Sequence, residues 1–171
     1  MGQMGSTELR EAVAGADDEA VTQLFVEYLT WAHPKLRDEY GIEDPPTSPE
    51  KIAETLVGFR RPSGVLLIAE RDRQAVGVGA LRRHSATIAE VKRMFVRPQA
   101  RSLHVGSSIL DRLLEDARAL DARVVRLDTV RFMTEAQRLY RSRGFLERPP
   151  YEGTEIPEPL RRYWLFFERA L

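Results

Sequence analysis

The sequence contains no cysteine among its 171 residues, and it has no long hydrophobic run and no excess charge of either sign. Without a thiol there are no disulfide bonds, thiolate zinc sites or cysteine nucleophiles. No apolar stretch approaches the roughly 20 residues of a membrane-spanning helix, and the N-terminus lacks the basic-then-apolar order of a signal peptide. The 26 basic and 26 acidic side chains cancel, which argues against a general nucleic-acid binder. We therefore expect a cytoplasmic protein that binds neither membranes nor nucleic acid.

The basic residues are almost all arginine, with 23 arginines and three lysines. This bias is typical of a GC-rich bacterial gene, and arginine suits the recognition of phosphate or carboxylate groups. The length fits one domain over residues 1–171, of which residues 1–6 are expected to be flexible.

Spacing of apolar residues predicts helices first and strands next. A helix is expected after Asp17 as N-cap. Residues 32–50 contain four prolines and are expected to form a long loop or a broken helix. Ser48 then caps a short helix through Val57.

Three antiparallel strands are predicted next, over residues 65–69, 76–81 and 88–96, because turn sequences separate these apolar runs. Gly77 and Gly79 indicate a bulge or a close backbone approach in the second strand.

The second half alternates between strands and helices. An amphipathic helix is predicted over 105–120 and a buried strand over 124–127. A capping box from Thr134 to Gln137 predicts a helix through Arg143, and a last strand is predicted over 163–167. This order predicts an α/β fold with a mixed sheet and helices on both faces.

The junction between residues 94 and 107 is the most informative for chemistry. A strand ends, a proline-containing turn follows, and a long helix begins at Gly106. Free amides at a helix start, together with the helix dipole, suit a pyrophosphate. From the spacing alone, an ordinary capped helix is the favoured interpretation.

Four stretches resemble the GNAT family of acyl-CoA N-acyltransferases: AEVKRMFVRP at 89–98, RSLHVG at 101–106, RLDT at 126–129 and AQRLYRSRGF at 136–145. The family's pyrophosphate loop usually reads Arg/Gln-x-x-Gly-x-Gly/Ala. The loop here departs from that pattern at His104, where glycine is usual.

The resemblance implies the GNAT fold, a mixed and mostly antiparallel sheet of six to seven strands. It also implies direct transfer of an acetyl group from acetyl-CoA to an amine, with no metal. The alternative is a non-catalytic acyl-CoA-binding or regulatory module, which His104 makes plausible. The residues implied to bind the cofactor are Met94, Phe95, Val96, Arg101, Ser102, Leu103, His104, Val105, Gly106, Ser107, Ala136, Tyr140 and Arg143.

Two residues are implied as catalytic. Tyr140 matches the family tyrosine that protonates the leaving thiolate, although a packed helical tyrosine is the alternative. Glu90 is either the base that deprotonates the amine or a structural ion pair with Lys92 or an arginine. Regular strand alternation predicts Glu90, Lys92 and Met94 on one face. Asp128, expected to end its strand, either orients a ligand or caps a loop.

The acceptor is implied to be a primary amine of a small molecule or peptide, bound by residues 28–58 and 149–162. Aromatic residues of these segments are expected to form a wall, namely Tyr28, Trp31, Tyr40 and Tyr151. Acidic residues are expected to form a mouth attractive to a cationic amine, namely Asp38, Glu39, Glu43, Asp44, Glu152, Glu155 and Glu158. A homodimer through the last strand is a further possibility that the apolar residues 163–167 leave open.

Overall fold

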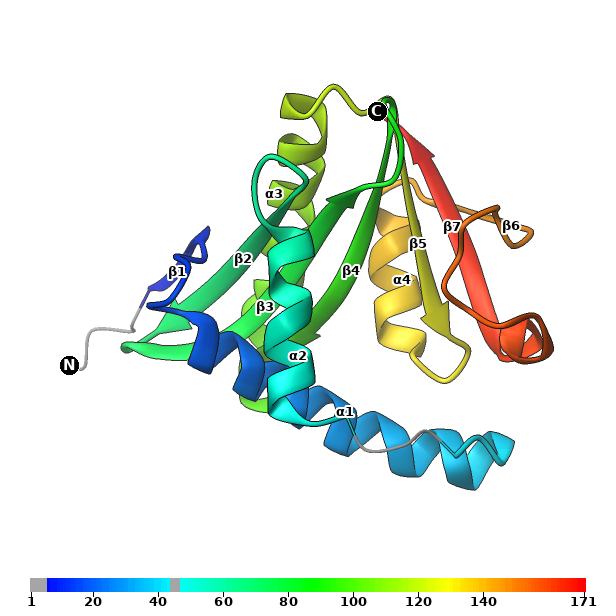
Figure 1. The fold of residues 1–171 in the computed structure, drawn as a ribbon, viewed down its shortest axis with the longest axis horizontal. Helices are drawn as coiled ribbons and strands as arrows, with labels where there is room; N and C mark the ends of the chain where they lie inside the picture. The colour runs from blue at the N-terminus through cyan, green and yellow to red at the C-terminus, as the bar shows by residue number, and fades with distance from the viewer. Residues whose placement is uncertain (1–5, 44–46) are drawn as a thin grey trace.

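One mixed seven-stranded sheet, in the order β1-β2-β3-β4-β5-β7-β6, organises the molecule (Figure 1). The computed structural model describes residues 6–43 and 47–171, so most of the segment expected to be flexible lies outside the described residues. The β4–β5 pair is parallel, and the other pairs are antiparallel. The predicted fold class is therefore confirmed. The strands are β1 Thr7–Glu11, β2 Gly64–Arg71, β3 Gln74–Arg83, β4 Ile88–Val96, β5 Val124–Val130, β6 Leu146–Arg148 and β7 Trp164–Ala170.

Helices cover both faces of the sheet. They are α1 Asp18–Tyr40, α2 Pro49–Thr55, α3 Val105–Ala119 and α4 Thr134–Ser142, with 3-10 turns at Leu56–Phe59, Pro98–Leu103 and Glu158–Tyr163. Helices α1 and α2 pack on one face, and α3 and α4 pack on the other (Figure 1). Alternate residues of β2 enter the two cores, with Leu67 facing α3 and Leu66 facing α1. This two-sided burial explains the continuous apolar run in that strand.

Helix α1 is longer than predicted, because it continues past Pro34 to Tyr40. The expected break at residue 32 is wrong. A proline interrupts one helical hydrogen bond, but buried Ala32 and Leu36 hold both sides of it against the rest of the protein. The helix ends at Gly41, whose left-handed backbone (φ 66°) allows its N–H to cap the last turn.

Asp17 is the N-cap residue of α1, as predicted, but its carboxylate accepts hydrogen bonds from Val13 N (2.6 Å) and from Arg10 on β1 instead of from the first helical amides. The predicted capping box at α4 is wrong, because Met133 occupies the N-cap position and the Gln137 amide donates to the carbonyls of Val130 and Arg131. In both places the side chain bonds to groups that precede the helix.

The edge strands β1 and β6 were not predicted. Their sequences, TELRE and LER, contain few apolar residues, and their side chains do not show the burial pattern of a core strand. They form because β2 and β7 offer free edges to pair with.

Strands β4 and β5 pair only at their beginnings, from Ile88↔Val124 to Glu90↔Arg126, and then diverge. A bulge at Arg93, with a left-handed backbone (φ 58°), interrupts β4 where its register with β3 shifts opposite Gly79. The extra residue reverses the alternation of side chains. Lys92 therefore lies on the α1 face and Met94 packs on the α3 side, so the expectation that they share a face is wrong.

Gly79 also permits close packing of α3 on the sheet, as its position in the sequence indicated. A Cβ built on Gly79 would lie 2.3 Å from Cγ2 of the buried Ile109 and 3.2 Å from Cδ1 of Leu113. We expect Gly79→Ala to lower the free energy of unfolding by about 1–3 kcal/mol, because the core would be overpacked. Urea unfolding measures this difference.

Gly58→Ala is the matched control, because nothing lies within 4 Å of a Cβ at exposed Gly58. Its stability should equal or slightly exceed that of the wild type. Equal stability of the two variants would contradict the close approach at Gly79.

Candidate active site

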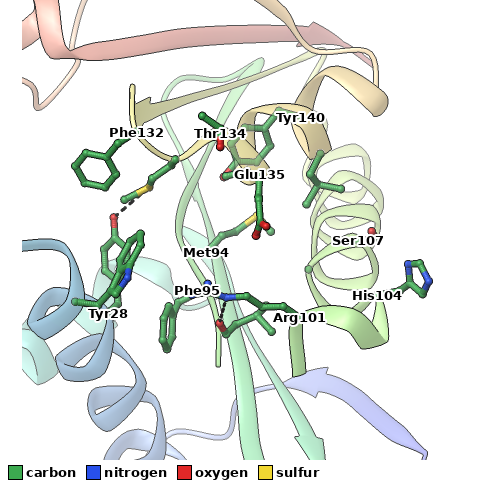
Figure 2. A pocket seen from close by; sticks show the side chains of 16 residues that line it. Tyr28, Met94, Phe95, Arg101, His104, Ser107, Phe132, Thr134, Glu135 and Tyr140 are labelled. Carbon is green, nitrogen blue, oxygen red and sulfur yellow. Dashed lines mark hydrogen bonds between the residues drawn. The ribbon is translucent and has the colours of Figure 1, made fainter. Parts of the chain in front are cut away.

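A pocket of about 480 Å³ lies where β4 and β5 diverge (Figure 2). The end of β4, the start of α3, the β5–α4 connection with α4, and the middle of α1 each contribute to its walls. The lining residues are Tyr28, Trp31, Met94, Phe95, Val96, Arg101, His104, Gly106, Ser107, Phe132, Met133, Thr134, Glu135, Ala136, Leu139 and Tyr140.

One end of the pocket is the N-terminus of α3. The first intrahelical hydrogen bond there is donated by Ser108 N to His104 O (3.0 Å), and no side chain caps the helix. The preceding amides, at Val105, Gly106 and Ser107, are thus available to an anion, and the helix dipole favours negative charge at this position. The pyrophosphate site stays a prediction, and these amides are the groups that would form it.

The structure brings most of the predicted cofactor residues to this pocket and leaves others outside. Met94, Phe95, Val96, Arg101, His104, Gly106, Ser107, Ala136 and Tyr140 line it. Ser102 and Leu103 are exposed on the preceding 3-10 turn, and Val105 is buried in the core. The Arg143 guanidinium pairs with Asp111 (2.7 and 3.1 Å), away from the lining.

Tyr140 is buried at the centre of the pocket wall, packed edge-to-face on Phe145 (6.0 Å between ring centroids). Burial raises the pKa of its hydroxyl far above the ordinary value, and the charges of Tyr28 and Asp128 raise it further. The phenol is therefore protonated at neutral pH and can donate a proton.

Glu90 does not line the pocket. Its fully buried carboxylate lies 2.7 Å from Lys92 Nζ through Oε1 and 3.0 Å from Arg82 Nη2 through Oε2. The Tyr151 hydroxyl donates a further hydrogen bond to Oε1 (3.2 Å). Both carboxylate oxygens are thus engaged in ion pairs, as the structural alternative predicted.

Lys92 joins this group to Asp128 across the gap, with 2.8 Å between Nζ and Oδ2. Burial would lower the pKa of Lys92, but the carboxylates of Asp128 and Glu90 raise it above its usual value, so the ammonium stays charged. Asp128 lies two residues beyond the last β4–β5 pair and does not end β5, which continues to Val130. The hydroxyl of Tyr28 lies in the pocket wall. Burial, with a smaller contribution from the charge of Asp128, raises the pKa of Tyr28 to about 12.

Comparison with known proteins agrees with this architecture. The family described as Acetyltransferase (GNAT) matches residues 19–145. The chain belongs to the GNAT acetyltransferase family. An IAA acetyltransferase of Azospirillum brasilense is 37% identical over 112 residues, covering 65% of this chain and 71% of that protein. An uncharacterized N-acetyltransferase of Schizosaccharomyces pombe is 30% identical over 111 residues, covering 63% and 68%.

Solved structures share the GNAT fold at low sequence identity. An acetyltransferase from Streptococcus agalactiae superposes with a TM-score of 0.78 at 20% identity, over 96% of this chain and 98% of that one. The PaiA N-acetyltransferase of Thermoplasma acidophilum, solved in complex with coenzyme A, gives a TM-score of 0.73 at 18% identity, over 97% and 99%.

The acceptor side of this GNAT chain differs from the sequence expectation. Tyr28 and Trp31 line the pocket, but Tyr40 lies behind Phe132, and Tyr151 is buried in the Glu90 group. None of the described residues of the expected acidic mouth lines the pocket, and Asp44 lies outside the described residues.

Sequence reasoning missed the lining contributed by the β5–α4 connection, Phe132 to Glu135, and by Leu139. The only feature of the sequence that indicated these residues was their position after the strand that contains RLDT. Within the described ranges, no group of three or more His, Asp or Glu side chains is arranged to hold a metal ion. No helix there is both long and apolar enough to cross a membrane.

His104 has a left-handed backbone, with φ 58° and ψ 17°, a region that favours glycine. The side chain is exposed, and Figure 2 shows its ring at the outer rim, directed away from Met94 and Tyr140. The ring therefore does not cover the centre of the pocket, but the loop carries a left-handed residue with a Cβ.

We expect His104→Gly to raise the free energy of unfolding by about 0.5–1 kcal/mol, because glycine adopts this conformation without a Cβ clash. His104→Ala is the matched control, since it removes the ring and keeps the Cβ, and its stability should not rise. Urea denaturation compares the three proteins. A gain in both variants would assign the strain to the ring instead of the backbone.

Proposed function

We propose that this chain is an N-acetyltransferase that moves an acetyl group from acetyl-CoA directly to a primary amine of a small molecule or an exposed amino group. One observation carries the proposal: a single pocket joins the free amides of the α3 N-terminus to the buried, protonated Tyr140. The relatives from Azospirillum brasilense and Schizosaccharomyces pombe are named as acetyltransferases, which supports the same reaction.

The residues present fit acetyl-CoA. The α3 amides suit its pyrophosphate. Beyond Glu90, β4 has no strand partner on its β5 side among the described residues, so Met94, Phe95 and Val96 present a free edge to the amide-containing pantetheine arm. Arg101, whose Nε donates to Val96 O (3.1 Å), lies beside this edge with a guanidinium able to meet phosphate.

The chemistry needs few protein groups, because the thioester of acetyl-CoA supplies an already activated acyl group. A backbone amide near Phe95 polarises the acyl carbonyl and stabilises the charge that develops on its oxygen. The Tyr140 hydroxyl delivers its proton to the departing sulfur. The pocket holds the amine and the acyl carbon together, which lowers the entropic part of the barrier.

The base that takes the proton from the acceptor amine belongs to the ion-paired group of Glu90, Lys92 and Asp128. We assign this role to Asp128. Glu90 is fully buried, and its two oxygens are occupied by Lys92, Arg82 and Tyr151. Asp128 is bonded through Oδ2 alone among the described residues, so its Oδ1 is left to accept a proton, and it follows the last β4–β5 pair by two residues; neither carboxylate lines the pocket itself. Lys92 orients the Asp128 carboxylate, with 2.8 Å between Nζ and Oδ2.

The proposal predicts coenzyme A release when folded protein is supplied with acetyl-CoA and amines. Tyr140→Phe should lower kcat by about 10²–10⁴-fold, because the sulfur then leaves without its proton. Its calorimetric affinity for acetyl-CoA should stay within about twofold, since the ring remains. Equal turnover of the two proteins would remove Tyr140 as the acid.

The same measurement tests the alternative function. Tight acetyl-CoA binding with no turnover of any amine would identify a non-catalytic acyl-CoA-binding module, the alternative that His104 makes plausible.

Asp128→Asn should reduce kcat by at least about 100-fold, whereas Glu90→Gln should reduce it far less. Thermal unfolding verifies that both variants are folded, because each removes a partner of Lys92. The reverse order of the two losses in folded proteins would return the role to Glu90.

A further inference from the structure

Aromatic side chains line the end of the pocket opposite α3. Tyr28 and Trp31 come from α1, and Phe132 comes from the β5–α4 connection. The Trp31 and Phe132 rings meet edge-to-face with 5.9 Å between centroids, and Tyr28 lies 6.3 Å from Trp31. Figure 2 shows Tyr28 and Phe132 on one side of the pocket and Ser107 and His104 on the other. We name Tyr28, Trp31 and Phe132 the aromatic end.

The rings of the aromatic end are held in place before any ligand binds. The Tyr28 hydroxyl contacts Met133 Sδ (3.8 Å), and the Tyr28 ring packs on Phe95 with 5.8 Å between centroids. Phe132 stacks on Tyr40 (6.0 Å), which in turn stacks on Tyr163 (4.5 Å). A ligand that binds rigid rings loses little additional entropy, so the arrangement suits recognition.

The charge around the aromatic end is positive. Lys35 Nζ lies 5.3 Å from the Trp31 ring centroid, and the Arg101 guanidinium lies 5.8 Å from it. Glu135 is the one acid among the described lining residues, and it belongs to the first turn of α4. A polyamine or a lysine-rich peptide would therefore meet like charge here, in contrast to the expected acidic mouth.

We propose that the aromatic end binds the body of the acceptor, and that the acceptor is a single primary amine on a short arm attached to an aromatic ring. This inference rests on the proposed transfer reaction. Offset and edge-to-face contacts with Tyr28, Trp31 and Phe132 select a planar ring over a saturated group of equal size. The amine then projects toward Tyr140, which lines the same pocket as the aromatic end.

The first experiment compares matched amines at saturating acetyl-CoA. 2-Phenylethylamine and 2-cyclohexylethylamine have the same arm and nearly the same size, and spermidine represents a polycation. We expect kcat/KM for phenylethylamine to exceed that for the cyclohexyl compound at least fivefold, and spermidine to be the poorest. Equal values for the ring pair, or a preference for spermidine, would overturn the proposal.

Variants of Phe132 assign the preference to the aromatic end. Phe132→Leu should abolish the difference between the two amines by raising the KM of phenylethylamine, with kcat nearly unchanged. Phe132→Tyr keeps a ring and should retain the preference. A preference that survives Phe132→Leu would place ring recognition elsewhere and overturn the assignment.

Binding separates a failure of this inference from a failure of the proposed function. Calorimetric titration of phenylethylamine into protein saturated with coenzyme A requires no turnover. Binding that Phe132→Leu weakens would uphold the aromatic end even if no acetyl transfer occurred, whereas absent binding would overturn it.

A longer acyl chain is the other possible occupant. Faster turnover of phenylacetyl-CoA or hexanoyl-CoA than of acetyl-CoA, lost in Phe132→Leu, would assign the aromatic end to the acyl group and overturn the proposal.

Discussion

The separation of β4 from β5 after three paired residues is the constraint on which the site depends. If the parallel pairing continued along both strands, there would be no gap between β4 and β5 for a ligand to enter. At the point of divergence, Lys92 on β4 forms an ion pair with Asp128 on β5. This ion pair joins the two strands where their backbone hydrogen bonds end. The bulge at Arg93 then turns Met94 toward α3, where it joins the pocket wall.

This geometry gives the two faces of the sheet different chemistry. On the α3 and α4 side lie the helix amides and Tyr140. On the α1 side lie the ion-paired group of Glu90, Lys92 and Asp128 and the rings of Tyr28 and Trp31. A donor that enters from one face and an acceptor that enters from the other can meet in the gap, which is the arrangement that direct transfer requires.

Much of the fold was predictable from local patterns. The bounds of β4 were predicted correctly from its apolar run, and α3 from its amphipathic spacing. The edge strands β1 and β6 were missed because their residues carry no burial pattern and pair only through a neighbouring edge. Helix α1 was predicted too short because burial of Leu36, which outweighs the cost of Pro34, is a tertiary effect. Asp17 was predicted correctly as the N-cap residue of α1, but its carboxylate pairs with Arg10 on β1 instead of capping the helix amides.

The sequence by itself determined the family, the start of helix α3 and the position of Tyr140 on α4, because these depend on contiguous residues and their spacing. Tertiary structure alone decided that Glu90 is fully buried in ion pairs and that Lys35 and Arg101 lie beside the Trp31 ring. A bulge reverses strand alternation, and the described residues of the expected acidic mouth do not line the pocket; one of them, Glu155, pairs with Arg82 (2.6 Å). Such partners are far apart in the chain, so no local pattern encodes them.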